Sequence, residues 1–394
     1  MDFKFSDTDE NFRSEFCKWL EANLPSEHRK TAFAIEFFAN EEGEEWEKRL
    51  AWHKKMHAAG WIGIQYPRQY GGRGATISQQ YIYDEELNRV GALQLVNGQG
   101  IGLVGPTLLH WGTEEQCRRY LPKMLAADEI WCQGYSEPGS GSDLASLQTR
   151  AVEDGDYFVV NGQKVWTSDA HHADMCFLLV RTDPTAPKHK GISYLLVDMH
   201  SPGIIVRPLV QMTGDRGFNE MFFEDVRVPK KNLVGEKNNG WLVALTSLMY
   251  ERRARDMTPI VHELATLARL VPREGSNEWD NSRVRQQVAD FACEAWAIRY
   301  LGLRQLTRQL KGLPPGPESS IQKLAYSELN LRVQKFAMEL LGAYGQITYQ
   351  APFAIDKGKW SYRMLAARGM IIGAGTSEIQ RNVIGERVLG LPKG

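Results

Sequence analysis

The feature that most constrains the fold is a central stretch, from about residue 129 to 234, in which short apolar runs follow one another closely. Turn-forming residues separate the runs, as at Asn161-Gly162, which we interpret as a hairpin turn. The intervals are too short for the crossover helices that join parallel strands, so we predict an antiparallel β-barrel or β-sandwich. The predicted strands are Tyr157 to Val160, Met175 to Val180, Ile192 to Val197, Ile204 to Val206 and Met221 to Phe223.

Helical periodicity lies on both sides of this stretch. Before it, apolar residues recur at spacings of three and four, as in Phe12, Phe16 and Leu20. After it, helices are predicted from Gly240 through Glu251 and from about Asn281 to Leu310, and a third carries an apolar stripe from Ile321 to Leu340. We therefore predict an α+β multidomain chain with an N-terminal helical domain (1–128), a middle antiparallel β-barrel or sandwich (129–236) and a C-terminal helical bundle (237–394).

Charge and hydropathy narrow the class of protein. The 47 Lys and Arg residues nearly balance 48 Asp and Glu, so no strong field favours nucleic acid or an anionic membrane. The first seven residues are interrupted by charges and do not resemble a secretory signal. No run approaches the roughly 20 apolar residues that cross a bilayer. We expect a cytoplasmic protein without a membrane span.

The cysteines and histidines do not indicate a metal site. The five cysteines are widely spaced, which argues against a disulfide framework and a zinc site. His53 and His57 have helical spacing, but two lysines and no Glu lie between them, so we expect no bound metal. A glycine-rich segment, Asn97 to Gly102, has no surrounding βαβ unit, and Gly105-Pro106 interrupts any helix after it, so we interpret it as a bend or a close helix contact.

Three polar segments are candidates for ligand binding. The first, Tyr135 to Asp143, packs two glycines and three serines into one turn, whose amides and hydroxyls suit a flat ligand or a phosphate. The second, Asn161 to Ser168, is expected to place Trp166 and Ser168 on one face of a strand, an arrangement that suits a stacked heteroaromatic ring. The alternatives are a polar surface turn and a core tryptophan.

The third segment lies near the C-terminus, from Ile372 to Asn382. Small residues form a loop, and Thr376 with Glu378 is expected to cap a helix. A cap alone explains much of this pattern, although the same amides and hydroxyls also suit a ligand at a helix N-terminus.

In this order and spacing, the three segments resemble the acyl-CoA dehydrogenase family, and the resemblance covers essentially the whole chain. Gly71-Gly72 and the terminal Gly375 to Arg381 add further matches. The resemblance implies two helical domains around a β domain, FAD bound between subunits, and an acyl-CoA substrate. It also implies an electron-transferring flavoprotein as acceptor and a tetramer, either of identical chains or with a paralogue.

The resemblance assigns roles to individual residues. Ser142 is expected to reach the substrate as well as the flavin, and Trp166 and Ser168 to flank the isoalloxazine ring. Two departures concern the adenosine side, where Glu339, Ala343 and Tyr344 replace the usual residues and no Arg-x-x-Phe-Gly segment precedes residue 281. The implied FAD contacts are Tyr135, Ser136, Ser142, Trp166, Ser168, Gly342, Gly345, Thr376 and Glu378.

The most informative departure concerns the catalytic base. Many members carry it two residues before the Thr of the terminal segment, where this chain has Ala374. A smaller group, which resembles isovaleryl-CoA, long-chain and bacterial sterol-side-chain dehydrogenases, carries a Glu before an Arg on the first long C-terminal helix, and this chain has Glu251-Arg252 there. Glu251 is therefore expected to abstract the α-proton. The Ala374 amide is expected to contact the thioester and Arg252 the substrate.

Other interpretations stay open. Glu251 and Arg255 have the spacing of a surface ion pair. Relatives that lack the usual base act as desulfinases or other eliminases. A third possibility is a non-catalytic subunit that completes the FAD site of a paralogue.

Overall fold

The computed structural model describes residues 5–25, 43–92, 95–251, 256–313 and 316–393, and the side chain of Glu251 lies outside the described residues. The chain forms two compact units, each assembled from separate parts of the sequence. One unit combines residues 1–35, 77–92 and 252–394, and the other combines 36–76 and 93–251. The division into three domains at residues 128 and 236 stays a prediction.

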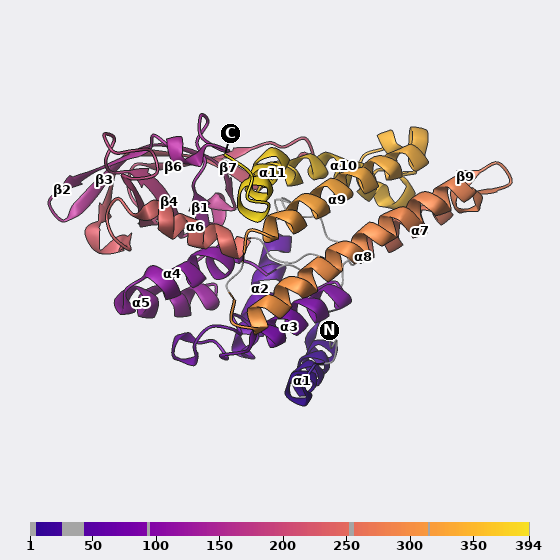
Figure 1. Cartoon of the computed structure of the whole chain (residues 1–394), viewed down its shortest axis with the longest axis horizontal. Coiled ribbons are helices and arrows are strands. Elements are labelled where there is room, and N and C mark those ends of the chain that lie inside the picture. The colour runs from indigo at the N-terminus through magenta and orange to yellow at the C-terminus, as the bar shows by residue number, and fades with distance from the viewer. Residues whose placement is uncertain (1–4, 26–42, 93–94, 252–255, 314–315, 394) are drawn as a thin grey trace. The chain divides into compact units, whose positions relative to one another are not determined.

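The second unit is built on an eight-stranded sheet (Figure 1). Its strands lie in the order β6-β7-β3-β2-β4-β5-β8, with β1 paired to β4. All seven residues of β4 are buried, because the strand has partners on both sides and covered faces. The strands are β1 (Trp131–Gly134), β2 (Arg150–Asp154), β3 (Tyr157–Ser168), β4 (Met175–Arg181), β5 (Ile192–Asp198), β6 (Ile204–Leu209), β7 (Phe218–Pro229) and β8 (Leu233–Val234).

Two details correct the expected sheet. The pairings of β1 and of β2 with β4 are parallel, whereas the other neighbours are antiparallel as predicted. Asn161-Gly162 does not form a hairpin turn but lies inside β3, which continues to Ser168. The glycine is needed there because a Cβ at residue 162 would lie 2.7 Å from the Cα of Thr149. The Asn161 side chain bonds Asp225 on β7, at a register shift.

One helix of the same unit begins at Gly240 and ends at the predicted base, Glu251. This helix, α6, packs against β5 and the helical segments before α5. Its first glycine is close-packed, since a Cβ at Gly240 would lie 2.5 Å from the backbone of Ser193. The helices are α2 (Glu44–Ala58), a π-helical turn (Gly100–Val104), α4 (Gly105–Trp111), α5 (Glu114–Leu125) and α6 (Gly240–Glu251).

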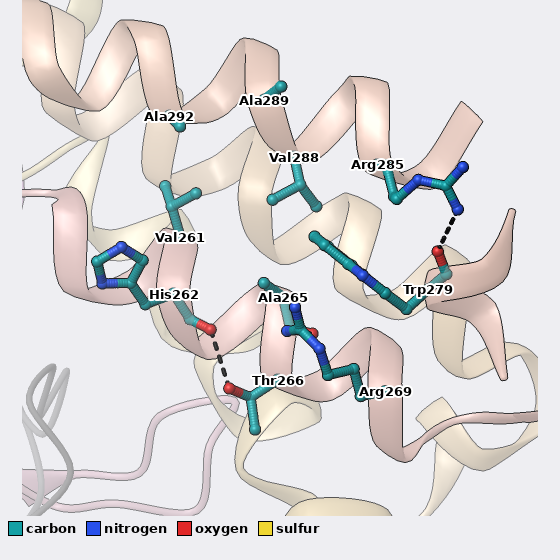
Figure 2. A pocket seen from close by; sticks show the side chains of 10 residues that line it. All are labelled: Val261, His262, Ala265, Thr266, Arg269, Trp279, Arg285, Val288, Ala289 and Ala292. Carbon is teal, nitrogen blue, oxygen red and sulfur yellow. Dashed lines mark hydrogen bonds between the residues drawn. The ribbon is translucent and has the colours of Figure 1, made fainter. Parts of the chain in front are cut away.

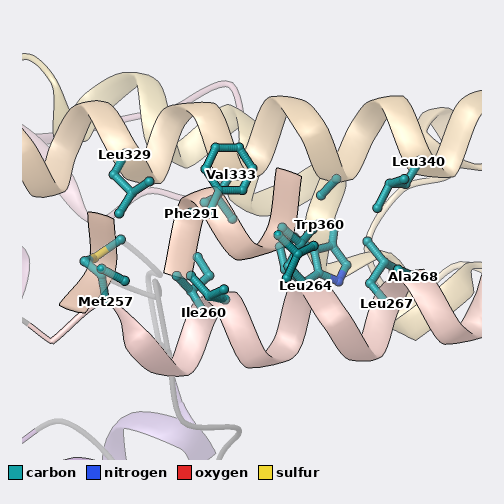
Figure 3. Packing of buried hydrophobic residues seen from close by; sticks show 14 of the residues in the cluster. Met257, Ile260, Leu264, Leu267, Ala268, Phe291, Leu329, Val333, Leu340 and Trp360 are labelled. Atoms are coloured by element: carbon teal, nitrogen blue, oxygen red, sulfur yellow. The ribbon is translucent and has the colours of Figure 1, made fainter. Parts of the chain in front are cut away.

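The other unit is helical. Figure 3 shows Ile260 and Leu264 of α7 facing Val333 of α9, with Phe291 and Trp360 also in this core. A short hairpin, β9 (Pro272–Arg273) with β10 (Ser276–Asn277), joins α7 to α8. The helices are α1 (Asp7–Asn23), α3 (Ile77–Val90), α7 (Thr258–Leu270), α8 (Ser282–Leu310), α9 (Ser319–Leu341), α10 (Lys359–Met370) and α11 (Ser377–Val383).

These observations confirm helical regions around a central β domain. The predicted helices over 240–251, 281–310 and 321–340 correspond to α6, α8 and α9. Ion pairs hold α1, α3 and α8 together, because Arg13 and Arg299 both bond Glu85, each at 2.9 Å. Within the described ranges, no helix is both long and apolar enough to cross a membrane.

Candidate active site

The loop after β1 is the first predicted flavin contact. Residues Glu137 and Ser140 exchange backbone hydrogen bonds of 2.8 and 3.0 Å and so form a tight turn. The Ser140 hydroxyl donates to the carbonyl oxygens of Asp143 and Leu144, which holds the next bend. Tyr135 is buried, Ser136 is half-buried and Ser142 is exposed. The exposed part of this loop offers a hydroxyl and uncrowded backbone, since a Cβ at Gly139 or Gly141 would meet nothing within 4 Å.

A buried ion pair lies directly beneath this loop. The Lys164 Nζ donates to the Tyr135 carbonyl at 3.0 Å and to Glu137 Oε1 at 2.8 Å, and the lysine is fully buried. Burial lowers the pKa of Lys164, and the Glu137 charge opposes that effect. Burial alone would raise the pKa of Glu137, but the charge and hydrogen bond of Lys164 outweigh it and the pKa is lowered. The carboxylate of Glu137 is therefore ionised at neutral pH, and its charge favours the charged form of Lys164.

Trp166 occupies an unusual position at the end of β3. A register shift between Lys164 and Thr167 opposite β7 makes a bulge, and Trp166 has φ +63°. A left-handed backbone costs a bulky residue on the order of 1 kcal/mol, so such a residue indicates a functional constraint. The indole is 60% exposed and meets the Phe218 ring edge-on at 5.8 Å. Trp166 is exposed and Ser168 is half-buried, with buried Thr167 between them, so the predicted common face of Trp166 and Ser168 stays a prediction.

Polar atoms without partners gather beside this bulge. Asn219 on β7 donates to the Thr167 carbonyl at 3.1 Å and lies 3.0 Å from His171 Nδ1. Within the described part of the chain, Thr167 Oγ1, Asn219 Oδ1 and His171 Nε2 are buried without a hydrogen-bond partner. Buried polar groups in folded proteins normally have hydrogen-bond partners, so this cluster departs from the usual pattern. The sequence reasoning missed them, although a polar Asn219 next to the apolar Met221–Phe223 run was a visible signal.

The helix that ends at the predicted base is held by buried hydroxyls. Ser247 on α6 is fully buried and its Oγ lies 2.8 Å from Thr107 Oγ1 and 3.3 Å from the Tyr194 hydroxyl. The Tyr194 ring also packs edge-on against Tyr135, with centroids 6.3 Å apart. The network connects α6 to the sheet and to the first predicted flavin contact. Glu251 is the last residue of α6.

The predicted roles of Glu251 and Arg252 rest on the sequence. The side chain of Glu251 and the whole of Arg252 lie outside the described residues. Helical spacing places position 251 one turn after Ser247 on α6. The α-proton base therefore stays a prediction.

The C-terminal loop belongs to the helical unit. Its carbonyl groups are held by two buried side chains, because Lys323 donates to the Gly375 carbonyl at 2.7 Å and Gln380 to the Ala374 carbonyl at 2.8 Å. Ala374 adopts φ +56°, again in the left-handed region. Thr376 caps α11, as predicted, by accepting from the Ile379 amide at 3.2 Å. Glu378 in the first turn is exposed.

The two glycines assigned to the adenosine side lie in a turn after α9. Gly342 ends that helix with φ +52°, and a Cβ there would meet nothing within 4 Å. Gly345 is crowded instead, since a Cβ there would lie 2.7 Å from the Met338 Cε. Tyr344 between them is exposed. The open backbone at Gly342 is compatible with a ligand, and the atom near Gly345 is the flexible end of a methionine, so the cofactor contacts of both glycines stay predictions.

Within the sheet unit, the predicted residues do come together. The Val165 amide donates to the Ser136 carbonyl at 2.9 Å, which joins the loop to the strand that carries Trp166 and Ser168. Thr376, Glu378 and Ala374 share one loop in the helical unit, and Gly342 and Gly345 share another turn of that unit. The assembly of contacts from both units around one flavin stays a prediction.

The sheet unit fits the flavin of FAD. An exposed indole in a strained conformation and the exposed Ser142 supply an aromatic surface and a hydrogen-bonding hydroxyl group. These are the groups that a planar ring with carbonyl and imine nitrogen atoms requires. The fit rests on residues of this unit alone.

A separate hollow lies between α7 and α8 and contains none of the predicted site residues (Figure 2). Its volume is about 620 Å³. Both arginines of the hollow contact Trp279. Arg269 stacks 4.0 Å from the centre of the Trp279 ring, and Arg285 donates to the Trp279 carbonyl at 2.9 Å. It is lined by Val261, His262, Ala265, Thr266, Arg269, Trp279, Arg285, Val288, Ala289 and Ala292.

Three family models match consecutive parts of the chain. The acyl-CoA dehydrogenase N-terminal domain matches residues 6–128, the middle domain residues 132–226 and the C-terminal domain residues 238–389.

Individual proteins match over almost the full length. The acyl-CoA dehydrogenase IpdE1 of Mycobacterium tuberculosis is 38% identical over 393 residues, which cover 98% of each chain. Among solved structures, the Tcur3481-Tcur3483 steroid ACAD is 31% identical with a TM-score of 0.82, covering 100% of both chains. The ChsE4-ChsE5 complex from Mycobacterium tuberculosis is 32% identical with a TM-score of 0.84, also covering 100% of both chains.

Proposed function

The chain belongs to the acyl-CoA dehydrogenase family, and on that premise we propose that it oxidises an acyl-CoA thioester to the 2-enoyl-CoA with FAD as cofactor. The observation that carries the proposal is the strained, exposed Trp166 beside the loop of Ser136 and Ser142. A strained aromatic residue on an exposed bulge has no evident value for stability. As a surface for a flavin ring, it has a direct use.

FAD, when bound, supplies the acceptor for the hydride from the β-carbon. Tyr135, Ser136, Ser142, Trp166 and Ser168 would hold the flavin end. The turn of Gly342 and Gly345 and the loop of Thr376 and Glu378 would contact the remainder of the cofactor.

The chain's own residues would move the α-proton. Glu251 would accept it, because position 374 holds an alanine that has no acid–base group. The Ala374 amide would donate to the thioester carbonyl and stabilise the negative charge that develops there. Lys323 and Gln380 support this role, since they hold the neighbouring carbonyl groups and so fix the orientation of the loop. Arg252 would contact the CoA part of the substrate or the acyl pocket.

For the substrate, we propose a CoA ester with a bulky acyl group derived from a steroid. The support is the similarity over the full chain to a protein described as a steroid ACAD. For the assembly, we propose a tetramer, and two-component relatives favour one that includes a paralogous chain. An electron-transferring flavoprotein would reoxidise the enzyme.

Anaerobic reduction tests the reaction directly. A panel of acyl-CoA thioesters is added to the purified yellow protein, and the flavin absorbance near 450 nm is followed. Steroid-derived thioesters are expected to bleach the flavin and give a product about two mass units lighter. Glu251→Gln is expected to bind the same thioester without bleaching. Normal bleaching by Glu251→Gln would refute the base assignment.

The remaining alternatives give different results in the same experiment. A desulfinase or eliminase would release a fragment of the substrate and leave the flavin oxidised. A non-catalytic subunit would acquire activity only with its paralogue, and Glu251→Gln in that complex would leave the activity unchanged. Co-expression with a paralogue from the same genome separates this last case from a failed preparation.

A further inference from the structure

The fully buried Lys164 and its partner Glu137 have no place in the proton or hydride transfer described above. We propose that they act as positioning residues that set the geometry of the two flavin-facing segments. The inference rests on the proposed function for its consequence in catalysis, but its structural part concerns only contacts within the sheet unit.

The pair joins segments that are separate in the sequence. Lys164 lies on β3, two residues before Trp166, whereas Glu137 follows Ser136 in the loop after β1. The lysine also donates to the Tyr135 carbonyl, so one ammonium group holds two points of the loop. A change in either segment is therefore transmitted to the other.

Glu137 extends the connection to the far side of the loop. Its two carboxylate oxygens accept from the amides of Gln148 at 2.6 Å and Thr149 at 2.8 Å. The carboxylate thus ties the start of the loop to the segment just before β2. The exposed residues Gly139, Gly141 and Ser142 lie between these two fixed ends.

The same pair holds one side of the Trp166 bulge. Lys164 precedes the bulge, and on its other side Asn219 binds the Thr167 carbonyl. A left-handed conformation persists only when surrounding contacts determine it. The anchored lysine and the asparagine are those contacts, and they keep the indole exposed toward its ligand.

Stability alone does not explain the pair. Burying two charges has a large desolvation cost, and a well-packed neutral pair is often as stable or more stable. A neutral pair would lack the lysine's simultaneous contacts with a carbonyl and a carboxylate. The advantage of the charged pair is therefore that it fixes the positions of the loop and the strand.

The deciding variant removes both charges together, as Lys164→Met with Glu137→Gln. Neither partner is left as an isolated buried charge, and the glutamine oxygen still accepts from the Thr149 amide. The expected result is cooperative unfolding at a lower midpoint than that of the wild type, because the Gln148 amide and the Tyr135 carbonyl each lose a hydrogen-bond partner. FAD is expected to bind at least tenfold more weakly, and kcat to fall at least tenfold while the KM for acyl-CoA stays within twofold.

A readout without flavin keeps this inference separate from the proposed function. The Val165 amide, which donates to Ser136, is expected to exchange with solvent at least tenfold faster in the double variant. If the wild type bound no FAD, either alone or with its paralogue, the proposed function would fail, and the exchange rate alone would decide whether the pair positions the segments. An unchanged exchange rate, or unchanged FAD affinity and kcat in a flavin-binding protein, would overturn the inference.

A control variant and two single substitutions at Lys164 complete the experiment. The control, Glu263→Gln with Arg363→Met, removes a buried ion pair of 2.8 Å from the helical unit, and Lys359 keeps its 2.9 Å contact with Asp356. It is expected to change stability without changing the Val165 exchange rate. If the double variant does not fold, Lys164→Arg is compared with Lys164→Gln. Arginine is expected to keep kcat within threefold and glutamine to lose at least tenfold, and equal losses would contradict the proposal.

Discussion

The Ser247 hydroxyl on α6 lies 2.8 Å from the Thr107 hydroxyl on α4, in a site from which solvent is excluded. The contact fixes α6 one helical turn before its final residue, Glu251. It therefore links the placement of the predicted base to the interior of the sheet unit.

Replacing Ser247 with alanine leaves the Thr107 hydroxyl and the Tyr194 hydroxyl with one partner fewer. We expect the free energy of unfolding to fall by about 1–3 kcal/mol, as when buried polar groups lose a partner. Urea denaturation measures the change. Thr266→Ala is the control, since that exposed hydroxyl donates to the His262 carbonyl of its own helix, and a change below about 0.5 kcal/mol is expected. Equal effects of both substitutions would contradict the role of the network.

In an ordinary strand, alanine gives a more stable protein than glycine. At residue 166, we expect the opposite order of stability. Because φ is +63°, Trp166→Gly should be more stable than Trp166→Ala by roughly 1 kcal/mol. Thermal unfolding of the two variants without cofactor measures this difference. Val159, on the regular part of β3, is the matched site, where alanine should be the more stable choice. A more stable alanine at residue 166 would show that the bulge relaxes once the indole is removed.

A carboxylate at residue 374 is expected to replace the base at residue 251. In the Glu251→Gln background, we expect a loss of flavin reduction of about 10²–10⁴-fold, typical for loss of a general base. Adding Ala374→Glu should recover at least tenfold of that rate. Ala374→Gln in the same background is the control, since it carries the same backbone strain without a carboxylate. Stopped-flow absorbance gives the rates, and equal rates for the two double variants would disprove the exchange.

Acid is expected to destabilise the sheet unit through His53. Burial lowers the pKa of His53 to about 4, while its Nε2 lies 2.9 Å from the Leu125 carbonyl. The unfolded chain therefore binds a proton below about pH 6.5 that the folded chain takes up only near pH 4. The contribution of neutral His53 to the free energy of unfolding is complete above pH 6.5. It declines by up to about 1.4 kcal/mol per pH unit as the pH falls toward 4.

The pH dependence is measured by denaturation at several pH values between 4 and 7. His53→Gln is expected to flatten the dependence, because glutamine keeps a donor for the Leu125 carbonyl but does not titrate. His110→Gln, at an exposed position, is the control and should leave the slope unchanged. If the free energy of unfolding of His53→Gln depended on pH as strongly as that of the wild type, other groups would be responsible for the acid sensitivity.

The periodicity of apolar residues was enough to predict the long helices and the β domain. α8 and α9 follow their predicted ranges closely, because an apolar stripe with capping residues at its ends leaves few alternatives. Asn161-Gly162 misled the prediction, since the same dipeptide that favours a hairpin turn also suits a close approach inside a strand. Local composition does not separate these two uses.

The residues of the candidate site stay predictions from the sequence, and the contacts that hold these residues in place could not be predicted from it. The polar turns and Trp166 stood out as short motifs. Nothing in the sequence showed that Lys164 is buried, because lysine is mostly exposed and its partner is distant along the chain. The contact between Ser247 and Thr107 depends on the packing of α6 and α4, which periodicity alone does not determine.

The parallel pairing of β1 with β4 has a consequence for the order of folding. β2 and β3 are neighbours in the sequence and pair locally, whereas β1 must wait for β4, about 40 residues further on. Loop closure over such a distance slows pairing. We expect the amides of Cys132 and Gln133 to become protected in pulsed hydrogen exchange after those of β2 and β3. The loop that begins at Tyr135 would then take its final shape late, which leaves cofactor capture to the last stage of maturation.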